Sequence, residues 1–351
     1  DHRDLHLSIR RQRQMCIRDS LIKTHDNPYS ITNTYRNHMA ANLDTSKIGT
    51  TQVEVTKIGM GGAPLGSLDR EIAFDTLDYA YQQGIRYFDT APLYGAGLSE
   101  QHYGSFLRTL PRNQFVLSSK VGRLIIPGDE IPFNYTRDGI LRSIDESLAR
   151  LDLDSLDIVL IHDPDDHYGP ALNEAFPTLS DLRDQGIIKA IGAGMNQWEM
   201  LVQFAKEADF DCFLIAGRYT LLDHSALHEL MPICLEKDIS LILGGPYNSG
   251  ILASNLEEES TYFYDPSPPE VIKKAKKIKQ VCDRYNTPLK AAAIQFGLMH
   301  PSVATTIPGP RSPEEIKDNI DMASISIPGD LWKELKQENL IHTDCPESYT
   351  N

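Results

Sequence analysis

Short apolar runs alternate with longer amphipathic segments from Val53 onward, and this alternation repeats eight times. Apolar runs of this length are typical of buried strands, whereas the segments between them have the three- and four-residue spacing of helices that bury one face. Strands that alternate with helices predict a parallel sheet. The predicted strands are 56–62, 87–91, 115–120, 156–163, 190–195, 212–217, 240–246 and 304–309.

Several of the predicted helices begin at Asp, Ser, Thr or Asn, which are capping residues, and Gly84 and Gly186 follow two of them as stop signals. Eight strand–helix units in about 290 residues fit one α/β TIM barrel, a (β/α)8 fold. We therefore predict a single barrel domain over residues 39–351, with extra helices at 289–300 and 330–340. The barrel helices are predicted at 69–83, 99–109, 136–151, 173–185, 197–207, 225–237, 268–285 and 312–322.

Residues 1–38 are polar and show neither helical nor alternating periodicity, so we predict that they are disordered. A second interpretation is that this extension is not native. Residues 11–20, RQRQMCIRDS, resemble a translated sequencing-adapter peptide, and Met39 would then be the natural start. For that reason we expect no contribution of these residues to function.

The charge balance excludes some partners. With 34 basic and 49 acidic side chains the net charge is −15, and nucleic acids or anionic membranes require a basic face. The lysine-rich run 271–281 fits a helix with solvated lysines opposite an apolar face. No apolar run approaches the ~20 residues that cross a bilayer. The five widely spaced cysteines contain no CxxC pair, and we expect a reduced, cytoplasmic setting.

Polar side chains stand at three successive strand ends. Asp89 and Tyr94 lie in YFDTAPLYG, Lys120 ends FVLSSK, and His162 follows LDIVLI. Because side chains at the carboxyl ends of barrel strands line the ligand site, these four residues are expected to converge.

This order of residues resembles the aldo-keto reductase family, whose catalytic Asp, Tyr, Lys and His occupy these strand ends. The resemblance covers about residues 51–341 and implies a nicotinamide-dependent oxidoreductase with Asp89, Tyr94, Lys120 and His162 as catalytic residues. Tyr94 would exchange a proton with the substrate oxygen. Lys120 would lower the pKa of that phenol, Asp89 would hold Lys120, and His162 would orient the substrate.

A metal-dependent barrel hydrolase is the alternative from another class, because residues 162–167, HDPDDH, contain metal-ligand types. Such hydrolases need a His pair after the first strand, where this chain has GMGGAP at 59–64. We therefore expect no metal at this site.

The cofactor is expected at the last strand and helix. Gly59, Gly61 and Gly62 lack the GxGxxG spacing of a Rossmann site. Residues 307–319, IPGPRSPEEIKDN, instead lead from a glycine turn into a helix, whose free N–H groups suit phosphate. The resemblance implies cofactor contacts from Gly61, Gly62, Gly309, Arg311, Ser312, Glu315 and Asn319.

Three departures from the family pattern matter. Relatives that prefer NADP carry a basic residue where this chain has Glu315, which favours NAD, although Arg311 argues for NADP. Asn196 stands one position later than the family residue that holds the nicotinamide carboxamide, and we expect it to hold that group here. Where an aromatic ring normally stacks on nicotinamide the chain has Gly244, and Tyr219 or Tyr247 is expected to fill that place. The loop from Gly245 to Gly250 offers backbone to the pyrophosphate.

Within the family, GGAPLG, FDTAPLYG, SSKVGR, IHDPDD and PYNSGIL are similar to the bacterial branch that contains D-threo-aldose, L-fucose and pyridoxal dehydrogenases. That similarity implies oxidation of an aldose to its lactone, with Asp163, Asp165, Asp166 and His167 as substrate contacts. The alternatives are an aldehyde or ketone reductase, a pyridoxal 4-dehydrogenase, and a nicotinamide-binding regulatory subunit. The sequence leaves the oligomeric state open.

Overall fold

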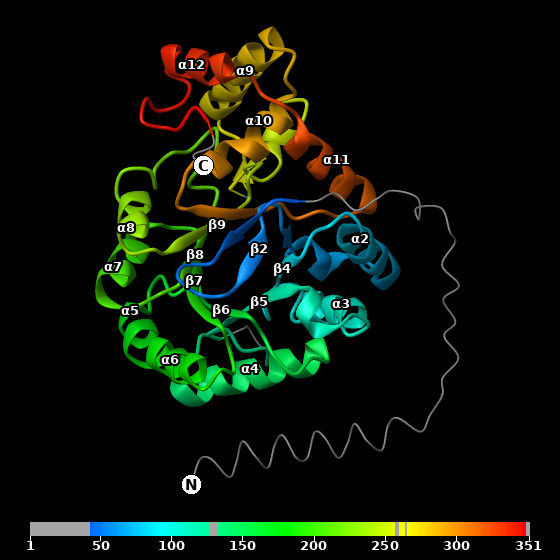
Figure 1. Cartoon of the computed structure of the whole chain (residues 1–351), viewed down its shortest axis with the longest axis vertical. Helices are drawn as coiled ribbons and strands as arrows, with labels where there is room; N and C mark the ends of the chain where they lie inside the picture. Colours follow the sequence, from blue (N-terminus) through cyan, green and yellow to red (C-terminus); the bar gives the residue numbers. More distant parts are fainter. Residues whose placement is uncertain (1–42, 127–131, 257–259, 264, 349–351) are drawn as a thin grey trace. The chain divides into compact units, whose positions relative to one another are not determined.

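A computed structural model describes residues 43–126, 132–256, 260–263 and 265–348, and the predictions for residues 1–38 lie outside this range. Eight parallel strands form one sheet in the order β12-β9-β8-β7-β6-β5-β4-β3. Ile58 pairs with Thr306 in parallel, which brings the two edges of the sheet together as a barrel (Figure 1). The strands are β3 (Met60–Gly61), β4 (Tyr87–Asp89), β5 (Val116–Val121), β6 (Ile158–His162), β7 (Ala190–Met195), β8 (Cys212–Ala216), β9 (Ser240–Gly244) and β12 (Val303–Ile307).

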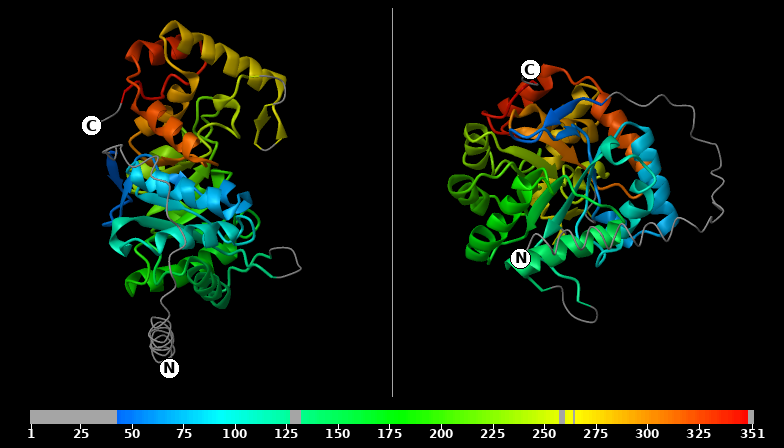
Figure 2. Two further views of the ribbon diagram at one scale, coloured as in Figure 1. Left: turned by 90° about the vertical axis from the view of Figure 1, so that its right-hand side faces the viewer. Right: turned by 60° about the horizontal axis from the view of Figure 1, so that its bottom comes forward.

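Helices cover the outside of the barrel, so the predicted (β/α)8 fold is confirmed. Helices α9 (Pro269–Arg284) and α12 (Gly329–Gln337) pack side by side (Figure 2). An ion pair between Arg284 and Glu334 connects them, at 2.6 Å. The short α5 (Tyr168–Pro170) runs through a π-helical turn at Ala171–Ala175 into α6. The other helices are α2 (Arg70–Gln82), α3 (Leu98–Leu107), α4 (Arg137–Leu151), α6 (Phe176–Asp184), α7 (Glu199–Glu207), α8 (Leu230–Glu236), α10 (Leu289–Phe296) and α11 (Pro313–Ser324).

The capping signals act as predicted at only some helices, since Asp69 precedes α2 without a side-chain cap bond and α3 follows Gly97 rather than beginning at Ser99. Thr136 accepts a hydrogen bond from the Gly139 N–H at the start of α4. Gly84 and Gly186 have φ of 96° and 70°, the left-handed conformation that ends a helix. In α9 the residues Ile272, Ala275, Ile278 and Val281 are buried, as the lysine-rich run predicted.

The structure differs from the prediction at three places. α8 begins at Leu230 rather than at 225, because Ser225 donates from its N–H and hydroxyl to Asp223 Oδ1 at 2.8 and 2.6 Å and so forms a turn instead. The predicted strand 56–62 is divided. Its first residue belongs to an antiparallel hairpin of β1 (Thr45–Lys47) and β2 (Glu54–Thr56), and the barrel strand β3 begins at Met60. A second small hairpin, β10 (Thr261–Tyr262) with β11 (Asp265–Pro266), was also not predicted.

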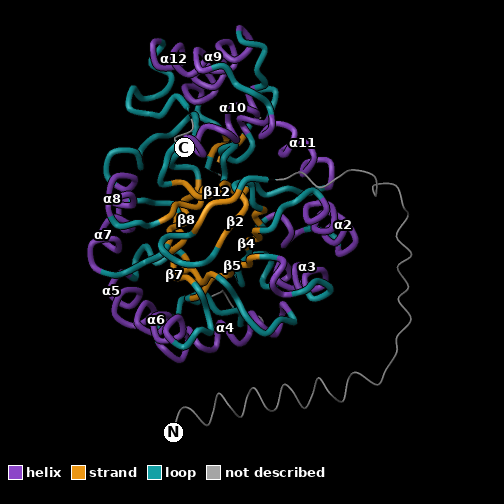
Figure 3. The backbone as a smooth tube through the Cα atoms, viewed as in Figure 1, coloured by secondary structure: helices purple, strands orange, loops and turns teal. Residues whose placement is uncertain are grey.

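The strands of the barrel lie inside a ring of helices (Figure 3), and the alternation of side chains along each strand places the polar residues at one end of the barrel. Tyr87, Ile158 and Leu160 belong to the apolar cluster inside the barrel, and Phe88, Val159 and Ile161 to the cluster between strands and helices. Side chains alternate along a strand, so Asp89 and His162, each two residues past an inward-facing one, point inward at the carboxyl end. Ile48, Val53 and Val55 from the hairpin complete the interior cluster.

No helix in the part of the chain that the structure describes is long and apolar enough to cross a membrane.

We predict that Ile48→Ala destabilises the fold by about 2–5 kcal/mol, because it opens a cavity in the interior cluster. Urea unfolding measures this, with the exposed Thr45→Ala as the matched control. Turnover in the absence of urea should stay unchanged, since the polar strand ends lie beyond the opposite side of the cluster. A destabilisation equal to that of Thr45→Ala would contradict the role of the hairpin.

Candidate active site

A buried ion pair stands at the centre of the carboxyl end. Lys120 is 1% exposed and Asp89 is 2% exposed. Lys120 Nζ donates to Asp89 Oδ2 at 2.7 Å and to the Thr90 carbonyl at 2.9 Å. Asp89 Oδ1 accepts from the Ser118 hydroxyl at 2.7 Å. Burial lowers the pKa of Lys120, but the Asp89 carboxylate and Tyr94 outweigh it and raise the pKa overall, so the ammonium stays charged.

Tyr94 reaches this pair from the loop after β4. Lys120 Nζ lies 4.7 Å from the centre of the Tyr94 ring. The loop is fixed by a close contact between two glycines. Gly95 has φ of 61°, and a Cβ there would lie 2.0 Å from the Gly66 carbonyl oxygen. Any side chain at position 95 would therefore displace Tyr94 from Lys120.

One predicted property of Tyr94 was wrong. Lys120 does act to lower the pKa of the phenol, but burial and the Asp89 charge raise it, and the net pKa lies above the ordinary phenol value. Burial disfavours the phenolate more than one ammonium, already paired with Asp89, stabilises it. The free protein therefore holds Tyr94 as a neutral phenol, ready to donate a proton.

His162 completes the group as a neutral ring. It is 5% exposed, and its ring lies edge-on to that of Tyr94 with centres 6.0 Å apart. Burial, together with the positive charges of Lys120 and Arg123, lowers the pKa of His162 well below its usual range. Its Nδ1 is buried and has no hydrogen-bond partner among the described residues. The structure thus brings together all four predicted catalytic residues.

Tyr135 holds the strand end that carries His162. Its hydroxyl donates to the His162 carbonyl at 2.6 Å and contacts the Asp163 carbonyl at 3.1 Å. The ring packs over Gly122, whose φ is 101° and where a Cβ would lie 2.1 Å from a ring carbon. Sequence reasoning missed Tyr135, because the segment around it has no periodicity; the glycine directly after a strand was the available signal.

A polar pair and an aromatic group border His162. Arg123 Nη1 donates to Asp163 Oδ2 at 3.4 Å, and this oxygen lies 3.5 Å from His162 Nε2. The Arg123 guanidinium covers Phe133, whose ring lies 4.8 Å from that of His167. Asp163 is therefore close to the reacting group, and the sequence did not indicate Arg123 or Phe133.

Asp165 and Asp166 are exposed on the loop after β6. Within the described ranges, the three side chains that lie close enough together to hold a metal ion are His228, His342 and Asp344. None of residues 162–167 belongs to that group.

The segment after β12 forms a capped helix start. The Glu315 N–H donates to Ser312 Oγ at 3.4 Å, and the Arg311 N–H donates to Glu315 Oε2 at 2.8 Å. This reciprocal cap holds Glu315 at the amino end of α11, next to the exposed Gly309.

The loop after β9 is bonded to the same helix. The Tyr247 hydroxyl donates to Asn319 Oδ1 at 2.8 Å. Gly245 and Gly250, with φ of 59° and 100°, flank this tyrosine and are exposed. Asn248, between them, has a buried Oδ1 without a hydrogen-bond partner in the described part of the chain. A helix start, exposed backbone and orphaned buried polar atoms fit the phosphates and amide of a nicotinamide dinucleotide.

The remaining predicted cofactor residues differ in position. Gly61 and Gly62 are buried, and a Cβ there would lie 2.9 Å from the Ile307 carbonyl oxygen and 2.6 Å from that of Asp89, so both allow close strand packing. Asn196 follows β7 and is partly exposed. Tyr219 is 2% exposed and packs against Phe296 and His300, so its ring belongs to the core and is not placed to stack on a ligand.

A family model described as "Aldo/keto reductase family" matches residues 57–339. This chain belongs to the aldo/keto reductase family. Aldo-keto reductases are oxidoreductases that act on small molecules with a nicotinamide dinucleotide as hydride carrier.

Relatives of this aldo-keto reductase agree with the assignment. It is 38% identical over 314 residues to D-threo-aldose 1-dehydrogenase of a Pseudomonas species, which covers 82% of this chain and 95% of the relative. It is 37% identical over 332 residues to pyridoxal 4-dehydrogenase of Microbacterium luteolum, which covers 84% and 97%. A solved aldo-keto reductase of Bacillus halodurans, in its holo form, has the same fold with a TM-score of 0.72, at 24% identity, covering 90% of this chain and 100% of that one.

The shifted pKa values predict an asymmetric pH profile. We propose Tyr94 as the proton acceptor in oxidation, and burial raises the pKa of this phenol, so the oxidation rate should still be rising at pH 10. Reduction needs the protonated phenol and should be level through neutral pH. Because the pKa of His162 is lowered well below 6.5, neither profile should break near that pH. Profiles of kcat/KM in both directions test this, and a break near pH 6.5 in both would contradict it.

Proposed function

We propose that this aldo-keto reductase oxidises an aldose at the anomeric carbon to the lactone, with NAD as the acceptor. The observation that carries the proposal is the placement of Tyr94 beside the buried Lys120–Asp89 pair, with neutral His162 edge-on to the phenol. The similarity to a protein named D-threo-aldose 1-dehydrogenase supports the substrate class.

Each residue then has one task. A bound nicotinamide dinucleotide would supply the acceptor for the hydride of the anomeric carbon. Tyr94 first releases its proton to solvent, and the Lys120 ammonium stabilises the phenolate that forms; this phenolate Oη then accepts the proton of the anomeric hydroxyl and becomes the neutral phenol. Asp89 keeps Lys120 charged and in place. Neutral His162 orients the substrate oxygen through its unpartnered ring nitrogen.

The pair of Arg123 and Asp163 suits a sugar. Their groups offer donors and an acceptor beside His162, where the hydroxyls next to an anomeric carbon require partners. Arg123 Nε is buried and lacks a hydrogen-bond partner within the described residues, which favours a polar ligand there. We assign Asp163 to substrate binding, with His167 and the exposed Asp166 as outer contacts. L-Fucose and D-threo-aldoses are the proposed substrates.

A pyridoxal 4-dehydrogenase is the second candidate. The rings of Phe133, Tyr135 and His167 lie within 6 Å of one another, and Phe133 is 42% exposed, which suits a flat aromatic substrate. The relative from Microbacterium luteolum bears that name.

The substrate proposal is tested by following NAD reduction with L-fucose, D-arabinose, L-galactose and pyridoxal. We expect turnover with an aldose and a loss of about 10²–10⁴-fold in kcat for Tyr94→Phe, because the phenolate of Tyr94 supplies the general base. Turnover with pyridoxal alone would favour the second candidate. Activity that persists in Tyr94→Phe would remove the mechanism.

The preference for NAD is proposed from Glu315. Its carboxylate accepts the Arg311 N–H at the start of α11, where a ribose 2′-hydroxyl could donate to it and a 2′-phosphate would be repelled. Arg311 is exposed and provides the opposing charge. We propose that the carboxylate dominates, and that Gly309, Ser312 and Asn319 hold the rest of the adenosine half.

Glu315→Gln should raise the kcat/KM ratio of NADP to NAD by roughly tenfold or more, since it removes the repulsion and the charged acceptor. Glutamine can still accept the Arg311 N–H and so keeps the helix cap. The substitution therefore removes the negative charge of residue 315 without removing the cap that stabilises α11. Glu315→Arg should raise the ratio further. If the ratio is the same in all three proteins, Glu315 does not select the cofactor.

A further inference from the structure

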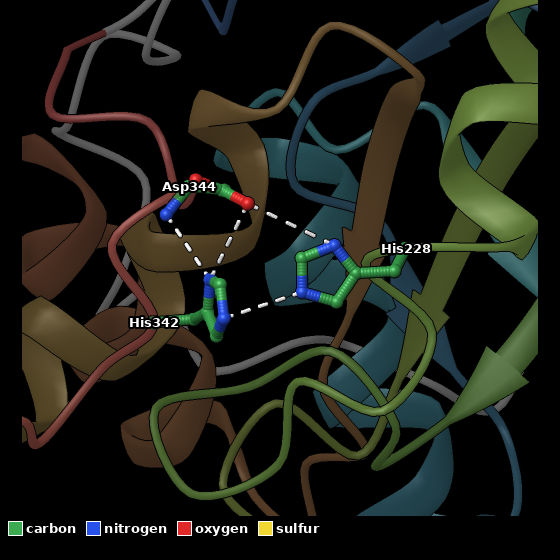
Figure 4. Close-up of side chains that lie close together, drawn as sticks. All are labelled: His228, His342 and Asp344. Atoms are coloured by element: carbon green, nitrogen blue, oxygen red, sulfur yellow. Dashed lines mark hydrogen bonds and ion pairs between the residues drawn. The ribbon is translucent and has the colours of Figure 1, made fainter.

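Two histidines from distant parts of the chain face each other, and neither belongs to the group of Asp89, Tyr94, Lys120 and His162. His228 lies in the turn before α8, and His342 and Asp344 lie in the segment after α12 (Figure 4). His228 Nε2 and His342 Nε2 are 3.3 Å apart, although 114 residues separate them. All three side chains are exposed, so an ion and its water ligands have access.

The distance between these nitrogens matches that of two ligands on one metal ion. A zinc–nitrogen bond of about 2.0–2.1 Å and a tetrahedral angle place two ligand nitrogens about 3.3–3.4 Å apart. We propose that His228 and His342 bind one divalent transition-metal ion, of which Zn²⁺ is the reference case, through their Nε2 atoms.

Asp344 lies on the other side of both rings. Its Oδ2 is 3.8 Å from His228 Nδ1 and 3.7 Å from His342 Nδ1. Ligand histidines usually donate their second ring N–H to a carboxylate, which orients the ring and raises its basicity. One carboxylate here faces the second nitrogen of both rings, so Asp344 acts as a positioning residue rather than as a ligand.

One hydrogen bond changes when the metal binds. In the metal-free protein the Asp344 N–H donates to His342 Nδ1 at 3.1 Å, so this nitrogen is an acceptor and the ring N–H lies on Nε2, directed at His228 Nε2. The ion replaces that proton between the two Nε2 atoms. His342 then carries its proton on Nδ1 and donates it to the Asp344 carboxylate, and the exposed backbone N–H turns to water.

The backbone on both sides is held in place. Leu227 and Leu230 are buried next to His228, and Ile341 and Cys345 are buried on either side of His342 and Asp344. The Cys345 N–H also donates to the His342 carbonyl at 3.1 Å. The histidines therefore meet without folding of a loose tail, which lowers the entropic cost of binding. A bound ion would fasten the end of the chain to the turn before α8.

Calorimetric titration of the chelator-treated full chain with ZnCl₂ tests the site. We expect one ion per chain, also with Ni²⁺ and Co²⁺, and none with Mg²⁺ or Ca²⁺, which prefer oxygen ligands. His228→Gln and His342→Gln should each weaken binding more than 100-fold. Asp344→Asn should weaken it by about 10–100-fold, as loss of an orienting carboxylate does.

The matched control is His6→Gln with His25→Gln, which removes two histidines outside the described residues and should leave the affinity unchanged. Zinc should also raise the melting temperature of the wild type but not of His342→Gln. Equal binding by wild type and His228→Gln, or several weak ions per chain in both, would overturn the proposal. Heat and melting temperature are measured without turnover, so the outcome is independent of the proposed aldose oxidation.

Discussion

The active site depends on one buried ion pair. Lys120 and Asp89 are nearly inaccessible, and removal of one partner of such a pair costs about 3–5 kcal/mol because the other charge stays buried and unpaired. The neighbouring groups reflect this arrangement: the Ser118 hydroxyl and the Thr90 carbonyl bond to the pair, and Tyr94 lies against the ammonium. Burial is the main cause of the lowered pKa of His162, and the positive charge of Lys120 adds to it. Burial likewise raises the pKa of Tyr94, against the effect of Lys120.

The residues that pack the barrel interior and the polar residues of the site lie at different levels along the barrel axis. Inward positions at the amino end carry apolar side chains that pack on Ile48, Val53 and Val55, whereas the next inward positions carry Asp89, Lys120 and His162. Because strand side chains alternate, the same strands supply both levels.

The sequence predicted the parts that follow from periodicity. Strand β7 was predicted at its observed limits, and the four catalytic candidates were expected together because each stands at a strand end. The pKa of Tyr94 was misjudged, since the sequence shows that Lys120 is a neighbour but not how deeply the phenol is buried. Tyr135 and Arg123 come from a segment without periodicity, and their roles depend on tertiary contacts. His228 and His342 are neighbours only because the end of the chain packs back on the turn before α8.

In the free protein, the hydrogen bond between Tyr247 and Asn319 connects the loop after β9 to helix α11. On the proposal that Asn319 contacts the cofactor, its amide N–H groups can donate to a dinucleotide while this bond is in place. A cofactor group that needs Asn319 Oδ1 instead competes with the tyrosine hydroxyl. Movement of the loop after β9 away from α11 would then become one step of cofactor exchange, and loop opening of this kind limits turnover in many enzymes.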